Sequence, residues 1–365
     1  MRKLPDFPWD RLAPAKARAG QHPDGIVDLS VGTPVDPVPA VVQDALRAGS
    51  DAPGYPLTHG TPALRAAAVG WMERRLGVTG VAPEAVLPVI GTKELVAWLP
   101  TLLGLGAGDT VAIPEVAYPT YDVGARLAGA DTLVTAPQDV PELIRTRRPG
   151  LVWLNSPANP HGRVAPAAEL RAVVAAAREV GTVVVSDECY IELAWEAAPV
   201  SVLHPEVCGG SHEGLLAVHS LSKRSNLAGY RAGFVTGDAA VVAELLEVRK
   251  HAGLIMPQPV QDAMTVALGD DAHAAEQKER YRRRRVMLRD ALEAAGFRVD
   301  HSEAGLYLWS SRDEDCWSTV DWLAERGILA APGEFYGEAG ARHVRVALTA
   351  TDERVAAAAE RLKGA

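Results

Sequence analysis

The run Thr182-Val-Val-Val-Ser-Asp187 is the segment from which the class of fold follows. It is apolar on both faces of a strand until its last two residues, and a helical pattern over about 166–180 precedes it. Strands that are apolar on both faces and separated by helices are typical of a parallel sheet that helices cover on both sides. We therefore expect a buried central strand that ends in a carboxylate.

The same alternation of short apolar runs and helical segments extends over much of the chain. The other apolar runs are 110–113, 133–135, 151–155, 215–220 and 232–236. The other helical segments of this part are about 63–76, 93–105 and 119–129. The sequence therefore predicts an α/β fold with a mostly parallel sheet covered by helices, with ligand chemistry at the carboxyl ends of its strands.

The two ends of the chain have different patterns. After residue 257, long helical stretches surround two short strand-like pieces, at 307–310 and 343–348, which predicts a smaller α+β domain. The first 40 residues are rich in proline and are interpreted as an extended arm. We expect an arm over 1–40 that contributes to the small domain, a large domain over 41–260 and a small C-terminal domain over 261–365.

The composition narrows the classes of function. The 365 residues contain 37 Lys and Arg against 46 Asp and Glu, a net charge of -9, whereas nucleic-acid binders usually carry a basic excess. The three cysteines form no Cys-x-x-Cys, so we expect neither a disulfide framework nor a metal site. The longest uncharged apolar stretch, 95–108, is shorter than the ~20 residues that span a bilayer. Because charges and prolines fill the first ten residues, no secretory signal is expected, and we predict a cytoplasmic protein that binds no membrane.

Four consecutive arginines, 282–285, lie inside one of the late helical stretches. Successive residues of a helix are ~100° apart, so these charges surround the helix instead of forming one stripe. We expect a solvated helix here, in preference to a phosphate-binding patch.

Lys223 is the first candidate for chemistry. The chain holds only 7 lysines beside 30 arginines, and this one follows a predicted strand within Ser220-Leu-Ser-Lys223. A desolvated lysine can lose its proton and form a Schiff base with a carbonyl, which arginine cannot do. On spacing alone, a lysine in a surface loop is an equal alternative.

Asp187 ends the strand quoted above, and a buried carboxylate normally needs a positive partner. A protonated pyridine nitrogen is one such partner, and an arginine of the protein is the other. Tyr190, three residues later, is placed to offer a phenol to the same ligand, although by itself it would more often be a packing tyrosine.

Two further motifs follow the pattern of ligand-binding loops. The turn Asn155-Ser-Pro-Ala-Asn-Pro160-His-Gly162 packs two X-Pro bonds together, and such turns contain cis prolines that can fix Asn159 toward a ligand. Gly91-Thr92-Lys93 precedes a helix whose free N–H groups suit a phosphate, with a plain helix cap as the alternative.

Taken in order, these motifs resemble those of the class I/II aminotransferases, which are pyridoxal-phosphate enzymes of the aspartate-aminotransferase fold. The likeness covers nearly the whole chain. The matching residues are Tyr55, Gly91-Thr-Lys93, Tyr118, Asn159-Pro-His-Gly162, Asp187-x-x-Tyr190, Ser220-x-Ser-Lys223, Arg231 and Arg345.

The resemblance implies a role for each residue around the cofactor ring. Lys223 would hold pyridoxal 5'-phosphate as a Schiff base, and Asp187 would pair with the ring nitrogen. Tyr190 and Asn159 would hydrogen-bond the phenolic oxygen of the ring, while Tyr118 would stack on its face. Lys223, Asp187 and Tyr190 are thus the expected catalytic residues.

The resemblance also implies how phosphate, substrate and a second subunit are held. The groups that would bind the phosphate are Ser220, Ser222, Arg231 and the backbone at Thr92 and Lys93. Tyr55 would reach the phosphate of the partner subunit, which implies a homodimer with shared active sites. Arg345, the backbone of Gly32 and Asn159 would bind the α-carboxylate of the substrate, for which a guanidinium is well shaped.

The predicted arm carries a narrower likeness. Residues 4–10 and 28–37 resemble the actinobacterial branch described as succinyldiaminopimelate aminotransferases, which implies L-glutamate as donor and N-succinyl-2-amino-6-oxopimelate as acceptor in lysine and diaminopimelate biosynthesis. The side-chain arginine of well-known aspartate aminotransferases is missing from residues 251–258, so simple aspartate specificity loses support.

Other functions remain as alternatives to this substrate. A broader aminotransferase for aromatic or aliphatic keto acids is the main one, and a C–S β-lyase or decarboxylase with the same fold is another. A transcription regulator with an aminotransferase-like domain is disfavoured, because the chain is acidic and shows no helix-turn-helix pattern before residue 40.

Overall fold

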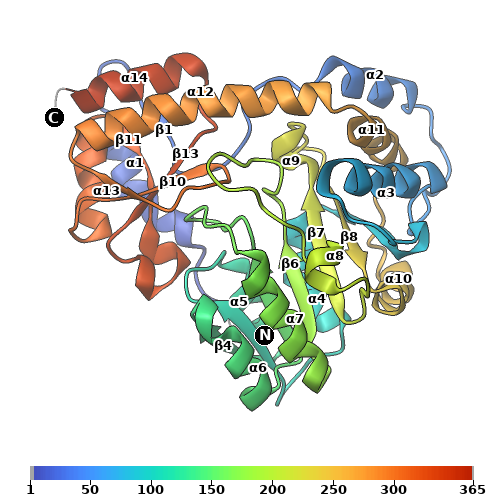
Figure 1. Cartoon of the computed structure of the whole chain (residues 1–365). Coiled ribbons are helices and arrows are strands. Elements are labelled where there is room, and N and C mark those ends of the chain that lie inside the picture. Colours follow the sequence, from blue (N-terminus) through green and yellow to red (C-terminus); the bar gives the residue numbers. More distant parts are fainter. Residues whose placement is uncertain (1–3, 364–365) are drawn as a thin grey trace.

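The computed structural model describes residues 4–363; residues 1–3 of the predicted arm and 364–365 of the predicted C-terminal domain lie outside the described part. A seven-stranded sheet, in the order β2-β8-β7-β6-β5-β3-β4, forms the centre of the larger part (Figure 1). Its strands are β2 (Val86–Ile90), β3 (Thr110–Pro114), β4 (Asp131–Thr135), β5 (Leu151–Asn155), β6 (Val183–Asp187), β7 (Leu215–Ser220) and β8 (Ala232–Gly237). β8 pairs antiparallel with both of its neighbours and the other pairs are parallel, so the predicted α/β fold with a mostly parallel sheet is confirmed.

Helices cover both faces of this sheet. One face packs against α4 (Thr92–Leu102), α5 (Thr120–Ala128) and α10 (Ala239–Ala252). The other packs against α2 (Ala40–Ala48), α3 (Pro62–Leu76), α6 (Val140–Arg147), α7 (Ala167–Val180), α8 (Pro205–Cys208) and α11 (Gln258–Gly269). Val184 and Val185 are both fully buried, one in each core, because successive side chains of a strand point to opposite faces.

β2 is a strand that the sequence pattern did not predict. It lies at the edge of the sheet and contains Pro88, which interrupts the expected apolar run. A proline donates no backbone hydrogen bond, and edge strands are where sheets tolerate it.

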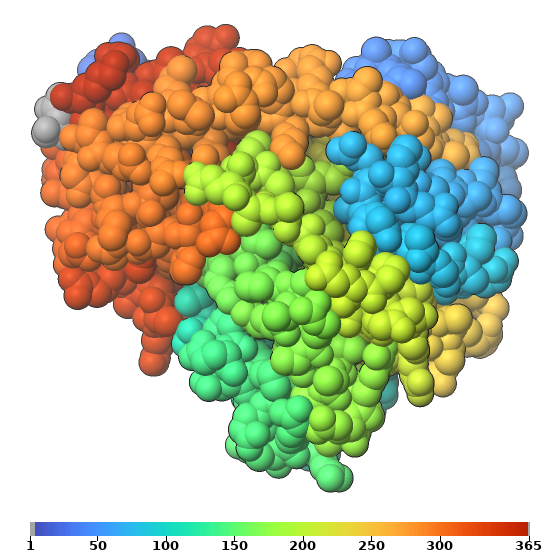
Figure 2. Space-filling model, viewed as in Figure 1, coloured from blue at the N-terminus to red at the C-terminus, as the bar shows by residue number. Residues whose placement is uncertain are grey.

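The C-terminal part contains a four-stranded antiparallel sheet in the order β12-β13-β10-β9. Its strands are β9 (Arg298–Asp300), β10 (Tyr307–Ser311), β12 (Ala331–Pro332) and β13 (Val344–Ala347). Helices α13 (Cys316–Glu325) and α14 (Asp352–Lys363) pack into the same core. The long helix α12 (Ala272–Ala294) runs from above the large sheet to this smaller part, along the top of the molecule (Figures 1 and 2).

The N-terminal arm packs into the core of the smaller part. Leu12, Val27 and Leu29 are buried there, and β1 (Val27–Asp28) pairs with β11 (Ile328–Leu329). The expectation of an extended arm is wrong over residues 8–19, which form the 3-10 helix η1 (Pro8–Leu12) and the helix α1 (Ala13–Ala19). The alanine-rich sequence of α1 favours a helix, and a proline near its start is compatible with one.

The expectation of a fully solvated arginine run is also wrong. Arg284 and Arg285 are buried: Arg284 pairs with Asp36 and Asp352, and Arg285 pairs with Glu196. The remaining two arginines of the run are exposed. The run does surround α12, but one face of this helix is buried, and Arg284 and Arg285 lie on that face.

Within residues 4–363, no helix combines the length and the apolar character that a membrane crossing requires. The same residues contain no group of three or more His, Cys, Asp or Glu side chains placed to hold a metal ion.

Candidate active site

A cavity of about 1380 Å³ lies where the large sheet, the smaller sheet and the arm meet. Its base is formed by residues at the carboxyl ends of β5, β6 and β7, the edge at which α/β sheets bind ligands. Twelve of the thirteen predicted site residues line it: Gly32, Thr92, Lys93, Tyr118, Asn159, Asp187, Tyr190, Ser220, Ser222, Lys223, Arg231 and Arg345. The thirteenth, Tyr55, is outside the cavity and fully exposed.

Asp187 is a buried carboxylate at the end of β6. It accepts hydrogen bonds from the Tyr121 hydroxyl, at 2.8 Å, and from the Cys189 backbone N–H, at 3.2 Å. Burial raises the pKa of Asp187, although these hydrogen bonds oppose the shift. Because no lysine or arginine among residues 4–363 forms an ion pair with it, the alternative of an arginine partner is excluded for this part of the chain. A ligand cation fits this carboxylate.

Lys223 lies in the short helix α9 (Leu221–Arg224), directly after β7. Its side chain is partly buried, lines the cavity and contacts the backbone oxygen of Gly32. Burial lowers the pKa of the Lys223 ammonium, and the positive charges of Arg345 and Arg231 lower it further. A neutral amine is a nucleophile, so this lysine is suited to Schiff-base chemistry and is not a lysine of a surface loop.

The N-terminus of α4 lies beside Arg231 and has the features of an anion site. α4 begins at Thr92 with no side-chain cap, so the alternative of a plain helix cap is not observed. The Glu94 N–H donates to the Gly91 backbone oxygen, which leaves the N–H groups of Thr92 and Lys93 for an anion. Gly91 has a φ of 73°, and a Cβ there would collide with the Arg231 guanidinium. Ser220 and Ser222 line the same cavity. The site therefore fits a phosphate.

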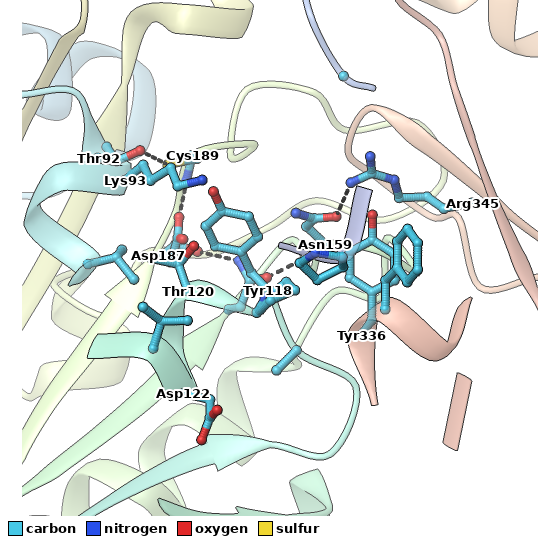
Figure 3. Close-up of a pocket in the computed structure, with 18 of the residues that line it drawn as sticks. Thr92, Lys93, Tyr118, Thr120, Asp122, Asn159, Asp187, Cys189, Tyr336 and Arg345 are labelled. Atoms are coloured by element: carbon cyan, nitrogen blue, oxygen red, sulfur yellow. Dashed lines mark hydrogen bonds between the residues drawn. The ribbon is translucent and has the colours of Figure 1, made fainter. Parts of the chain in front are cut away.

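Arg345, on β13, is buried on the opposite side of the cavity from Asp187 (Figure 3). It donates to Asn159 Oδ1 at 2.9 Å and to the backbone oxygen of Ser30 at 2.8 Å. Its guanidinium carbon lies 3.9 Å from the centre of the Tyr307 ring. Its Nε has no hydrogen-bond partner among the described residues, and no acidic side chain there pairs with it. The guanidinium therefore keeps an unpaired N–H and an unpaired charge that suit a carboxylate of a ligand.

The turn that carries Asn159 is as expected. Both of its X-Pro bonds, Ser156–Pro157 and Asn159–Pro160, are cis. Asn155 Oδ1 accepts a hydrogen bond from the Asn159 backbone N–H at 2.8 Å, which fixes the turn against the end of β5.

The structure also shows polar groups that sequence reasoning missed. Tyr121 donates to Asp187 from the first turn of α5, whereas Tyr118 precedes that helix, so no shared helix face in the sequence indicated this partner. Tyr307 on β10 lies 3.1 Å from Tyr190, hydroxyl to hydroxyl, and nothing in its sequence context indicated this. Burial would raise the pKa of Tyr307, but the charges of Arg345 and Lys223 outweigh burial and lower it.

The fold, the buried Asp187 and the lysine and arginine that face the same cavity define a class of enzyme. The chain belongs to the class I and II aminotransferases, whose family model matches residues 24–362. Enzymes of this class use pyridoxal 5'-phosphate, and this protein is a transaminase.

Two similar relatives are known by name. The chain is 62% identical over 362 residues to OxyQ of Streptomyces rimosus, a 4-dedimethylamino-4-oxo-anhydrotetracycline transaminase, covering 99% of this chain and 100% of OxyQ. It is 64% identical over 359 residues to a probable aminotransferase of Mycobacterium tuberculosis, covering 98% of this chain and 85% of the relative.

Solved structures share the whole fold. A probable N-succinyldiaminopimelate aminotransferase from Thermus thermophilus matches with a TM-score of 0.88 at 29% identity, over 98% of this chain and all of that one. An aspartate aminotransferase double mutant from the same species matches with a TM-score of 0.86 at 27% identity, over 99% and 97%. The predicted aspartate-aminotransferase-like architecture is therefore confirmed.

Proposed function

We propose that the chain transfers the amino group of L-glutamate to a 2-keto acid in the cavity described above. The observation that carries this proposal is the placement of Arg345, a buried cation without a carboxylate partner among the described residues, in the same cavity as Lys223 and Asp187. A substrate carboxylate on Arg345 would place the amino group toward the lysine. Lys93, whose ammonium forms no ion pair within the described residues, is available for the second carboxylate of glutamate.

The residues present fit pyridoxal 5'-phosphate. Asp187 is a buried carboxylate without a cationic partner among the described residues. Gly91 has no Cβ and so leaves room for the Arg231 guanidinium beside the N-terminus of α4. We assign the phosphate to the groups that the motifs indicated, which are Ser220, Ser222, Arg231 and the backbone at Thr92 and Lys93. When bound, the cofactor supplies an electron sink for the carbanion that forms at the substrate Cα.

The chain's own residues would then perform four tasks. Asp187 holds a proton on the ring nitrogen, while Tyr190 and Asn159 donate to the phenolic oxygen. Tyr118 stacks on the ring. Lys223, whose pKa is lowered by burial, would act as the base that takes the proton from the substrate Cα and then as the acid that delivers it to C4′ of the cofactor.

Two classes of acceptor are each supported by a different observation. The likeness of the arm supports N-succinyl-2-amino-6-oxopimelate, as does the fold shared with a probable N-succinyldiaminopimelate aminotransferase. OxyQ, by its name, acts on a tetracyclic ketone, and aromatic side chains line part of this cavity, which supports an aromatic acceptor. Of the two relatives described above, OxyQ has a substrate in its name and the probable aminotransferase of Mycobacterium tuberculosis does not.

We also propose a homodimer. Tyr55 is fully exposed and lies outside the cavity of its own chain, as required of a residue that serves the phosphate of a partner subunit. An isologous dimer would complete both cavities at once.

Glutamate-dependent turnover of a panel of acceptors tests the function. The panel contains the succinylated keto acid, oxaloacetate, pyruvate and phenylpyruvate. We expect glutamate alone to change the absorbance of the bound cofactor, and one acceptor class to show the highest kcat/KM. If glutamate leaves the absorbance unchanged and no acceptor is aminated, the proposal is wrong.

A further inference from the structure

Aromatic rings from both ends of the chain form one wall of the cavity. The wall consists of Phe7 and Trp9 from the arm and of Phe335 and Tyr336 from the 3-10 helix η4 (Gly333–Tyr336). Ring centroids are 5.6 Å apart for Phe7 and Trp9, 5.4 Å for Trp9 and Phe335, and 6.2 Å for Trp9 and Tyr336. The four side chains therefore form a continuous surface, which we call the aromatic wall.

The aromatic wall begins at the carboxylate-binding arginine. The guanidinium carbon of Arg345 lies 5.9 Å from the ring of Trp9 and 5.0 Å from that of Tyr336. Figure 3 shows Arg345, Asn159 and Tyr336 on the same side of the cavity. A substrate held by its α-carboxylate on Arg345 would therefore extend its side chain along these rings.

Two features of the aromatic wall suit the binding of a ligand. Phe7 lines the cavity beside the Trp9 ring and the Lys93 ammonium, yet it is still 53% exposed. Tyr336 is 2% exposed, yet its hydroxyl has no hydrogen-bond partner there, and a buried polar group is normally paired. A ligand with a flat apolar surface and one polar atom would satisfy both.

The charged side chains of the cavity restrict the charged groups that such a ligand can have. Its basic side chains are Lys93, Lys223, Arg231 and Arg345, which the proposed function uses for cofactor, α-carboxylate and glutamate. The lining also includes Asp6, Glu115 and Glu338, which are exposed and form no ion pair among the described residues. The Lys93 ammonium lies 5.4 Å from the centre of the Phe7 ring, where the proposed function places the second carboxylate of glutamate. An acceptor carboxylate that extends past Lys93 would find no further cation among the lining residues and would meet these acidic side chains.

We infer that the aromatic wall is a binding subsite for the planar, aromatic or conjugated body of an acceptor that has no distal carboxylate. This inference rests on the proposed aminotransferase function and names its acceptor class. Stacking against Phe7 and Trp9 would hold the body, and the Tyr336 hydroxyl would donate to a polar atom on it.

Binding of unreactive carboxylates to the cofactor-loaded enzyme tests the subsite without turnover. Isothermal calorimetry would compare 3-phenylpropionate with hexanoate, which has no ring, and with suberate, whose second carboxylate would reach the outer end. We expect 3-phenylpropionate to bind most tightly and suberate least tightly. Suberate binding more tightly than 3-phenylpropionate would overturn the inference.

A substitution on the arm assigns the effect to the ring. Phe7→Leu keeps an apolar side chain, and we expect it to weaken 3-phenylpropionate about two- to tenfold while hexanoate is unchanged, the range for one aromatic pair. Leu4→Ala is the matched control, because it removes apolar surface from the same arm without removing a ring, and should leave the preference for 3-phenylpropionate intact. An equal loss for both ligands in Phe7→Leu would contradict a stacking role.

The proposed function fails on a different observation. If glutamate does not change the absorbance of the bound cofactor, the donor assignment is wrong, whatever the calorimetry shows. If glutamate reacts but the wall shows no preference for rings, only the acceptor class is wrong.

Discussion

The hydrogen bond from Tyr121 to Asp187 allows a direct test of how the protein sets the pKa of Asp187 and, through it, the affinity for the cofactor. Tyr121 is fully buried, stacks on Trp153 with a centroid distance of 4.9 Å and donates its hydroxyl to Asp187 Oδ2 at 2.8 Å. Tyr121→Phe keeps the ring and its stacking and removes only the hydroxyl. Of the hydrogen bonds described for Asp187, that from the Cys189 backbone to Oδ1 would remain.

The expected magnitude follows from the charge and burial of Asp187. A hydrogen bond to a charged group contributes about 1.5–3 kcal/mol, and one pKa unit corresponds to about 1.4 kcal/mol. Burial already raises the pKa of Asp187, and the hydrogen bond from Tyr121 opposes that shift, so loss of the Tyr121 hydroxyl would raise the pKa further. Ionised Asp187 is the form that pairs with a protonated ring nitrogen, and without the Tyr121 hydroxyl this buried charge would form at a cost greater by up to about 1.5–3 kcal/mol. We therefore expect cofactor affinity to fall by up to about ten- to a hundredfold.

The pH dependence has a definite sign. Because the folded-state pKa of Asp187 is raised, its ionisation destabilises the folded apoprotein as pH rises through that pKa. The loss of unfolding free energy in Tyr121→Phe relative to wild type should therefore be larger at pH 8 than at pH 4, where a larger fraction of Asp187 is protonated in both proteins. Denaturant unfolding of the two apoproteins at both pH values measures this difference.

Absorbance titration of apoprotein with cofactor at pH 8 measures the affinity. The control is Tyr336→Phe, which removes a hydroxyl that has no hydrogen-bond partner among the described residues and should leave cofactor affinity unchanged. Equal cofactor affinity in Tyr121→Phe and wild type would refute the role of the Tyr121 hydroxyl in cofactor binding.

Three further predictions follow from other parts of the structure. Lys223→Ala should lose both the visible absorbance of the bound cofactor and turnover, and normal turnover would exclude this lysine as the base. Mixing Tyr55→Phe chains with Lys223→Ala chains should give activity above the sum of the two parents if sites are shared, because one site of each mixed dimer is intact; activity equal to the sum would argue against sharing. Arg249→Leu should lower the free energy of unfolding by about 3–5 kcal/mol, because it leaves Glu94, its bidentate partner at 2.9 and 3.1 Å, without a cation. Denaturant unfolding beside the Arg249→Leu, Glu94→Leu double variant, which should recover much of the loss, checks that reasoning.

Much of the large sheet was predictable because its strands are buried on both faces. Such strands appear as continuous apolar runs, and polar residues at their ends, as at Asp187 and Ser220, stand out. β2 was not predictable by this criterion, since an edge strand with Pro88 lacks the run. Arg284 and Arg285 were misjudged because sequence shows how charges are distributed around a helix, but not which side of α12 other elements cover.

The site residues that belong to sequence motifs were predictable. Those that reach the site only through tertiary packing were missed. The motif residues Lys223 and Arg345 do line the cavity. Tyr307 comes close to Tyr190 only because β10 and the loop after β6 are packed together, at a separation of 117 residues. The aromatic wall likewise joins residues near 7 and near 335, which no local pattern connects.

The position of Arg345 links substrate recognition to the junction between the two parts of the molecule. Its guanidinium donates to Asn159, which extends from the large sheet, and to Ser30, which belongs to the arm, while the arginine itself is on the smaller sheet. A carboxylate that binds both guanidinium nitrogens would compete for these hydrogen bonds and rearrange contacts among all three elements. Binding energy from the carboxylate would then fix their relative position, and with it the contact between Lys223 and Gly32 of the arm. A substrate without a carboxylate could not supply that energy, which is why Arg345, although it takes no part in proton transfer, should affect kcat as well as KM.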